Sequence, residues 1–358
     1  MSFVSHNCVL LAAAGFLFAS CTKSSNNGGT TPTPDSTVYI AGYNGSNAIL
    51  WKNGVADTLS TTSSTANQVI VNGTDVYVAG VAQGQMIYDP PTTLSGPETG
   101  QYVYWKNGTQ NNIDTFQNIN YAASVSVSGT DVYFSDGAGW KNGSVISFPA
   151  IGSAGKNFSP GHVIATSTDG TDVYFTGTDT LENVVYWKNG DITIAAPYGG
   201  RGTTQPLVSC MYVSGGNVYV GGMAVQGVYW LNGTANFMQP RPADNSFLSN
   251  VNSLFVSGTD VYNTGVMIPI GLPAGVYLGA SYWKNGVEND LQLINPANAN
   301  TSYVTTSVFI SGSDIYVSGY SRTSSSPSSP PIDSAVYWKN GVEYSLHTPG
   351  RANSIFVK

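Results

Sequence analysis

Short runs of alternating apolar and polar residues fill the chain from Thr37 onwards. One stretch contains four of them, at 307–310, 315–317, 335–338 and 343–346. Alternation with a period of two is typical of β-strands, because successive side chains point to opposite faces of a sheet. Gly, Asn, Asp, Ser and Thr separate the runs, and tight turns prefer these residues. The pattern predicts an all-β protein of short antiparallel strands.

This four-strand unit, whose strands we call A to D in chain order, repeats seven times. The pentapeptide Tyr-Trp-Lys-Asn-Gly, or a close variant, marks strand C and the C–D turn of every unit. Gly-Thr-Asp-Val-Tyr, or a close variant, marks the A–B turn and precedes every tryptophan except the first in full form. Asn-Gly predicts a two-residue hairpin turn with positive φ at both positions. A residue that recurs once per unit is expected to pack between units rather than to bind a ligand. The tryptophans are Trp51, Trp105, Trp140, Trp187, Trp230, Trp283 and Trp338.

A four-stranded unit cannot bury both faces of its sheet alone, so neighbouring units must pack face to face in a ring. The first unit starts with a strand B at 37–42, and the chain ends with a strand A at 352–357. Joined, these two segments complete one blade and remove the exposed sheet edges. The sequence therefore predicts a seven-bladed β-propeller of four-stranded antiparallel blades, closed by a C-terminal strand A that completes the N-terminal blade. An open β-solenoid is the alternative.

Two resemblances accompany these repeats. Tryptophan in strand C resembles the propellers that carry a Trp-Asp dipeptide there, although Lys follows Trp in this chain. Over residues 37–358, the YWKNG and GTDVY segments resemble a group of bacterial surface lipoproteins. The second resemblance implies an extracytoplasmic propeller and supplies no catalytic residue.

The first residues have the layout of a secretory signal peptide. An apolar run at 9–19 is about half as long as a membrane-spanning helix requires. Small residues before Cys21 resemble the bacterial lipoprotein signal, which implies that Cys21 carries the lipid. We therefore expect a signal peptide over 1–20, a lipid-anchored flexible linker over 21–36 and the propeller over 37–358. The expected location is the bacterial cell envelope, at the outer membrane or cell surface. A cleaved signal peptide with an incidental cysteine is the alternative.

Composition limits the partners of the chain. Charged residues make up only 9% of it and the net charge is −7, so no basic patch exists to hold nucleic acid. Cys8 leaves with the signal peptide and Cys21 would carry lipid, which leaves Cys210 without a disulfide partner. We expect Cys210 to be a small buried residue. The mature protein is expected to be a monomer that meets a membrane through its lipid anchor only.

Antiparallel order places the A–B and C–D turns on one face of the ring, which we call the turn face. The B–C and D–A connections lie on the opposite face, the loop face. Strand B and strand C are joined by as few as four residues at 136–139, but by long segments at 81–101, 266–280 and 320–334. Variable loops on a rigid frame often carry function. A site is therefore expected off-centre on the loop face, over units two, six and seven.

Arginine and tyrosine are the candidate ligand-binding residue types. Six lysines fall on the turn face beside the turn aspartates, whereas all four arginines fall on the loop face. Arginine suits bidentate recognition of carboxylate or sulfate, and exposed aromatic rings stack on sugars or form protein hot spots. The alternative is that the arginines order the loops through acids such as Asp333 and that the tyrosines pack. The candidates are Tyr88, Tyr102, Arg201, Arg241, Tyr277, Arg322 and Arg351.

Catalytic chemistry has little support in the sequence. After signal removal, His162 and His347 are the remaining histidines, and His162 could border the central channel as a structural residue. No cofactor, metal site or catalytic residue is predicted. The sequence thus predicts a non-catalytic binding module that holds a glycan or a protein on its loop face. The alternatives are a polysaccharide-acting enzyme that uses loop-face carboxylates such as Glu98 and Glu182, and a purely structural envelope protein.

Overall fold

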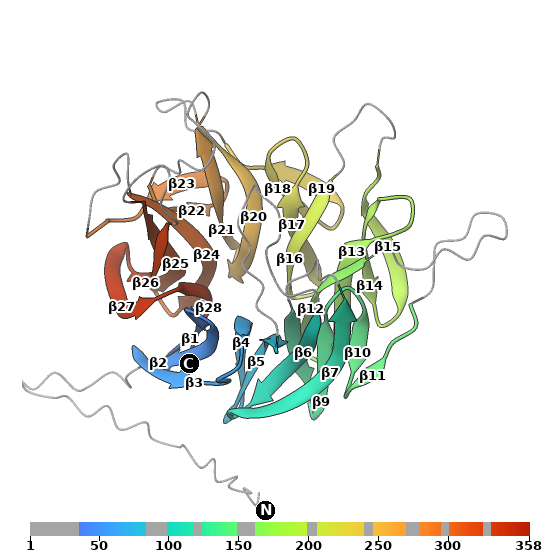
Figure 1. The fold of residues 1–358 in the computed structure, drawn as a ribbon. Coiled ribbons are helices and arrows are strands. Elements are labelled where there is room, and N and C mark those ends of the chain that lie inside the picture. Colours follow the sequence, from blue (N-terminus) through green and yellow to red (C-terminus); the bar gives the residue numbers. More distant parts are fainter. Residues whose placement is uncertain are drawn as a thin grey trace, which may run out of the picture. The chain divides into compact units, whose positions relative to one another are not determined.

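A computed structural model describes most of the chain from Ser36 onwards. Seven four-stranded antiparallel sheets stand around a common axis and form a seven-bladed β-propeller, which confirms the predicted fold (Figure 1). No helix in the described part of the chain is long and apolar enough to cross a membrane. The described ranges are 36–83, 99–117, 123–148, 162–198, 206–239, 246–269, 279–294, 301–324 and 331–358.

The blades are numbered 1 to 7 by the order of their tryptophans, and the strands of each blade follow in the order A to D. Blade 1 comprises β28 (Arg351–Val357), β1 (Val38–Asn44), β2 (Asn47–Lys52) and β3 (Val55–Thr58). Blade 2 comprises β4 (Thr65–Asn72), β5 (Asp75–Ala82), β6 (Thr99–Lys106) and β7 (Thr109–Gln117). Blade 3 comprises β8 (Ser124–Ser128), β9 (Asp131–Ser135), β10 (Gly139–Lys141) and β11 (Ser144–Val145).

The remaining four blades have the same strand order. Blade 4 comprises β12 (His162–Asp169), β13 (Asp172–Thr178), β14 (Val184–Lys188) and β15 (Asp191–Ala196). Blade 5 comprises β16 (Leu207–Ser214), β17 (Asn217–Met223), β18 (Gly227–Leu231) and β19 (Thr234–Phe237). Blade 6 comprises β20 (Ser246–Ser257), β21 (Asp260–Pro269), β22 (Ser281–Lys284) and β23 (Val287–Asp290). Blade 7 comprises β24 (Thr301–Ser311), β25 (Asp314–Thr323), β26 (Ile332–Lys339) and β27 (Val342–Pro349).

The two ends of the propeller sequence meet in blade 1, as predicted. β28 pairs antiparallel with β1, with Val357 opposite Val38 and Ile355 opposite Ile40. The seven strands A contact one another in the cyclic order β28, β4, β8, β12, β16, β20 and β24, so they form a closed inner ring. At the turn face, Thr37 and Lys358 exchange two backbone hydrogen bonds of 2.7 and 3.0 Å. The first described residues of the chain therefore lie at the turn face.

The tryptophans pack in the core between blades, as their recurrence predicts. Five of them are at most 1% exposed and Trp230 is 4% exposed, whereas Trp140 of the short third blade is half-buried. Each tryptophan lies opposite one residue of strand B, and in six blades that residue is Ile, Val or Phe. Blade 6 differs, because Asn263 lies opposite Trp283.

All seven Asn-Gly pairs of the C–D turns have positive φ at both residues, as predicted; in blade 1, for example, φ is 51° at Asn53 and 81° at Gly54. A second glycine recurs in strand B of six blades, at a position outside the two sequence motifs. It lies five residues after the turn aspartate, as Gly80 does in blade 2, and strand A bulges by one residue opposite it in six blades. A Cβ atom at Gly80 would lie 2.1 Å from the carbonyl oxygen of Thr65, so no side chain fits there. Blade 3 carries Asp136 at this position.

Candidate functional site

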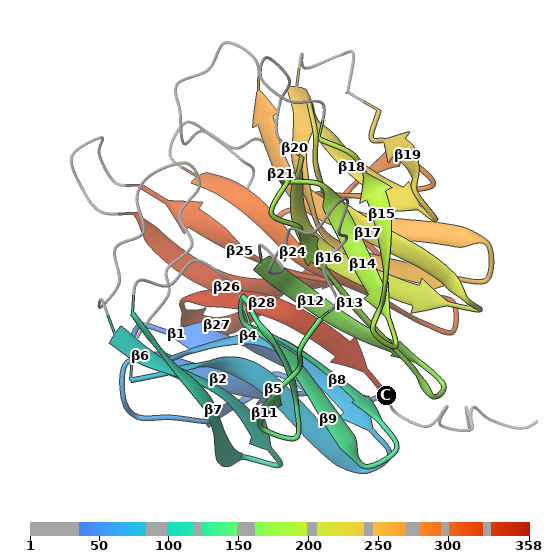
Figure 2. The ribbon, with the colours of Figure 1, turned by 90° about the vertical axis from the view of Figure 1, so that its right-hand side faces the viewer.

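Strands A and B are longest in blades 6 and 7, which are drawn in gold and in orange to red (Figure 2). Their strands A and B contain between 10 and 12 residues, whereas β8 and β9 of blade 3 contain five each. A small apolar cluster of Val266, Val304 and Tyr320 joins the extended part of β21 to β24 and β25. We call these extended strands the raised arc. It occupies the part of the ring where the long B–C segments of blades 6 and 7 predict a site.

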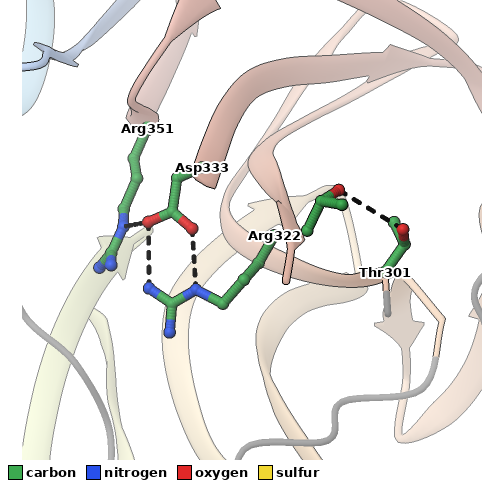
Figure 3. A network of polar contacts seen from close by, with 5 residues as sticks. Thr301, Arg322, Asp333 and Arg351 are labelled. Atoms are coloured by element: carbon green, nitrogen blue, oxygen red, sulfur yellow. Dashed lines mark hydrogen bonds and ion pairs between the residues drawn. The ribbon is translucent and has the colours of Figure 1, made fainter. Parts of the chain in front are cut away.

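Two of the seven candidate residues, Arg322 and Arg351, converge on one carboxylate at the base of the raised arc (Figure 3). Arg322 lies directly opposite Asp333 on β25 and β26. Its Nε and Nη2 atoms donate to the two carboxylate oxygens at 2.8 and 3.0 Å. Arg351, at the start of β28, donates from Nε to Oδ2 of Asp333 at 2.6 Å. Asp333 therefore links blade 7 to the strand that closes blade 1.

Glycine makes the approach of Arg351 possible. Gly350 has a φ of 128° and donates its backbone N–H to the carbonyl of Asp333 at 2.8 Å. A Cβ atom at Gly350 would lie 1.9 Å from the carbonyl oxygen of Tyr43, so only glycine can make this connection between β27 and β28. The charge cluster is thus placed by backbone geometry as well as by charge.

Two tyrosine rings enclose the arginines. The guanidinium carbon of Arg351 lies 4.5 Å from the ring centre of Tyr320 and 5.9 Å from that of Tyr43, both within cation–π range. Burial opposes the charge of Arg351, but Tyr320, Tyr43 and Asp333 outweigh it and hold the guanidinium pKa above its ordinary value. Burial also raises the pKa of Tyr43 far above 10, so its hydroxyl stays protonated. Arg351 therefore stays charged and Tyr43 stays neutral at every physiological pH.

Burial decides what this cluster can do. Arg351 is 4% exposed, and the side chains of Arg322 and Asp333 are each 12% exposed. Arg322 and Arg351 both bind the carboxylate of Asp333, Arg322 with two hydrogen bonds. Bonds of this kind fix the closing strand β28 against the raised arc. The loop-ordering alternative for Arg322 and Arg351 thus matches the contacts that they make. Little of the surface of these two arginines is exposed for direct contact with a large ligand.

The other candidates divide into one buried residue and four that lie outside the described residues. Tyr102, on β6, is 4% exposed and packs edge-on against Phe134 with ring centres 6.5 Å apart. Alternation alone does not reveal this, because the blade 3 residue that covers Tyr102 is distant in sequence. Tyr88, Arg201, Arg241 and Tyr277 lie outside the described residues, as do the lipid-attachment candidate Cys21 and the loop glutamate Glu98.

Asp136 of blade 3 is a loop-face acid that is not among the predicted candidates. It is 7% exposed, and its Oδ1 accepts hydrogen bonds from Trp140 Nε1 at 2.9 Å and from the backbone of Ala138 at 3.0 Å. Its Oδ2 is buried without a hydrogen-bond partner. Burial raises the pKa of Asp136 to about 6, although the two donors oppose the shift. A comparison of the repeats could have identified Asp136, because the other six blades carry glycine at this position.

Three further expectations concern single residues. Cys210 is a free thiol that contacts the carbonyl of Val251 at 3.7 Å, and burial raises its pKa to about 12, so it is a poor nucleophile. His162 begins β12, where the sequence places it, and its side chain is exposed. Glu182 is exposed on the B–C turn of blade 4. Within the described residues, no group of three or more His, Cys, Asp or Glu side chains could hold a metal ion.

The turn face carries one charge arrangement that repeats in five blades. In blade 2, Lys106 Nζ lies 2.8 Å from Asp75 Oδ2 and 5.3 Å from the ring centre of Tyr77. Hydrogen bonds from Lys106 and Asn107 lower the pKa of Asp75. Blades 3, 4, 6 and 7 repeat the ion pair. Exposed pairs of this kind stabilise a protein only slightly, and their opposite charges cancel locally. The turn face therefore repeats one arrangement of paired opposite charges in five blades.

Comparison with known proteins identifies no family. No protein-family model and no curated protein matches the chain. Solved structures with a similar course of the chain include a subtype N11 neuraminidase-like protein of A/flat-faced bat/Peru/033/2010 (H18N11), at 11% identity and a TM-score of 0.41 over 81% of this chain and 89% of that one. Another is apo AztD from Citrobacter koseri, at 10% identity and a TM-score of 0.33 over 90% of this chain and 98% of that one. Scores this low carry no argument about function.

Proposed function

We propose that this propeller is a non-catalytic binding module, lipid-anchored to the bacterial cell envelope, which holds a glycan or a protein on its loop face. The observation that carries the proposal is the difference between the two faces. The turn face repeats one neutral arrangement, while the loop face rises over blades 6 and 7.

Contacts with the ligand would come from the loop segments, and the charge cluster would support them. Tyr102, Tyr320 and Arg351 are each 4% exposed, which leaves little of their surface for a ligand. The Asp333 cluster instead holds the raised arc against the closing strand. Interaction surfaces commonly combine a rigid frame with aromatic and arginine side chains presented by loops. Tyr88, Arg201 and Arg241 are the residues proposed for this direct role.

Binding screens of the mature lipid-free chain against glycan and envelope-protein arrays would test the proposal. A triple Ala substitution of Tyr88, Arg201 and Arg241 should weaken binding to any identified ligand without a change in the melting temperature. The matched control is Lys106→Ala with Asp75→Ala on the turn face, which should leave affinity intact. Unchanged affinity in the triple variant would refute loop-face binding, and conversion of the ligand into a product would refute a non-catalytic role.

Anchoring is tested separately with Cys21→Ser. The full chain should partition into detergent and incorporate labelled fatty acid, while the variant should do neither. Fatty acid incorporation that persists in Cys21→Ser would overturn lipid attachment at this residue, without bearing on binding by the loop face.

A further inference from the structure

The asparagine of each C–D turn acts as a clamp between strands B and C. In blade 2, the backbone N–H of Asn107 donates to the carbonyl of Val76 at 2.9 Å, and Val76 N–H donates to Asn107 Oδ1 at 2.8 Å. The side-chain oxygen thus takes the place of a backbone carbonyl in the ladder. The amide nitrogen Nδ2 then donates to Asp75 Oδ1 at 2.8 Å. Both atoms of the side-chain amide are therefore held.

The first part of this clamp is present in all seven blades, and the second part is not. Every C–D asparagine accepts a backbone N–H through Oδ1 at 2.8 or 2.9 Å. Five donate from Nδ2 to a turn aspartate at 2.8 Å. In blade 5 the acceptor is the neutral Asn217, at 2.9 Å from Asn232. In blade 1 Thr37 occupies the aspartate position, and among the described residues no carboxylate accepts from Asn53.

This difference matters because Asn-Gly is chemically labile. The backbone nitrogen of the glycine attacks Cγ of the asparagine, a C–N bond forms, and ammonia leaves to give a succinimide. Water then opens the ring to aspartate or isoaspartate, so no oxidant or cofactor is required. For the attack, Cγ must swing toward the glycine nitrogen, which breaks the hydrogen bonds of the side-chain amide. A charge-assisted bond to aspartate opposes that movement more strongly than a bond to a neutral group does.

We propose that, among the seven C–D turns, Asn53 is the modification site at which the folded protein deamidates first. Its clamp lacks the carboxylate that holds five of the others. Blade 1 is thus the blade most prone to the reaction.

Peptide mapping by mass spectrometry after incubation of the folded full chain at mildly alkaline pH tests the proposal. All seven turns are compared within one sample. Asn53 should convert roughly tenfold faster than the five aspartate-clamped asparagines, the factor that one charge-assisted hydrogen bond corresponds to. Asn232 should fall between them. The Asn44-Gly45 and Asn72-Gly73 pairs lie in other turns and are read separately. An Asn53 that converts no faster than the five would overturn the proposal.

Two reciprocal variants separate the clamp from other effects of the blade. Thr37→Asp installs the missing acceptor and should slow conversion at Asn53, while Asp75→Thr removes an acceptor and should accelerate conversion at Asn107. Denatured protein provides the control, because all seven turns should then convert at similar rates. Unchanged rates in both variants, or a fast Asn53 that persists equally in the denatured chain, would show that the clamp does not govern the reaction.

Discussion

Replacement of Asp136 by asparagine should stabilise the protein at neutral pH. The amide oxygen of the variant can keep the bonds from Trp140 and Ala138, while the charge on the buried carboxylate disappears. Buried carboxylates without a positive partner are costly, because desolvation penalises the charged form. An electrostatic contribution from Asp114 raises the pKa further. The parent residue is therefore predicted to destabilise the fold wherever it is ionised.

The magnitude follows from the pKa of Asp136, which is raised from 3.8 to about 6. At about 1.36 kcal/mol per unit, the ionised side chain costs the fold roughly 3 kcal/mol above pH 6. The folded pKa exceeds the unfolded pKa, so this penalty is absent below pH 3.8, grows as the pH rises from 3.8 to about 6 and is complete above that pH. The new amide NH2 group takes the place of the unpartnered Oδ2 and costs about 1–2 kcal/mol. A net gain of roughly 1–2 kcal/mol is expected at pH 7.5.

Urea unfolding of parent and Asp136→Asn across pH 4–8 measures this difference directly. Protonation of the other carboxylates at low pH changes the free energy of unfolding of both proteins equally, so it cancels in the difference curve. The matched control in the same blade is Asp131→Asn, where bonds from Lys141 and Asn142 lower the pKa, so that variant should lose stability at neutral pH. A difference curve for Asp136→Asn that is flat between pH 4 and 8 would refute the reasoning, as would a loss of stability at pH 7.5.

Three other substitutions test the packing arguments by urea unfolding. Asp333→Ala leaves two buried guanidinium groups without their shared acid and should cost about 3 kcal/mol or more; a cost under about 1 kcal/mol would show that the cluster is not a support. Gly80→Ala places a methyl group 2.1 Å from the carbonyl of Thr65 and should cost about 2 kcal/mol or more, whereas an unchanged midpoint would mean that the bulge can move. Asn263→Val removes two buried amide atoms that have no hydrogen-bond partner and should stabilise the fold by about 1–3 kcal/mol. Valine fits this position in blade 7, where Val317 lies opposite Trp338. Destabilisation would indicate that water satisfies the amide.

Repetition explains why so much of the fold could be predicted from the sequence. Trp51 and the six tryptophans like it occupy the same strand position, so one interpretation applied to seven blades at once. The Asn-Gly turns required only local backbone chemistry, and their positive φ values follow directly. The closure of blade 1 followed from two incomplete units at the two ends of the repeat array. Each of these inferences needed only the repeat pattern of the sequence.

Residues that depart from the repeat were harder to interpret. Asp136 and Asn263 are single exceptions at positions where the other six blades agree, so their environments are set by the neighbouring blade and not by local pattern. Tyr102 and Tyr320 stand beside long loops in the sequence, and the sheets cover both of them. The bulge opposite Gly80 depends on a backbone approach between two strands. A one-dimensional pattern contains none of these distances.

The position of β28 has a consequence for the order in which the propeller can be completed. β28 supplies the inner strand of blade 1 and contacts both β24 and β4, yet it is the last strand of the propeller to be synthesised. Blades 2 to 7 contain only strands that leave the ribosome earlier. A chain interrupted before Arg351 would have an inner ring open between β24 and β4, with the apolar faces of those strands uncovered. The inner ring therefore stays open until these seven residues have been added.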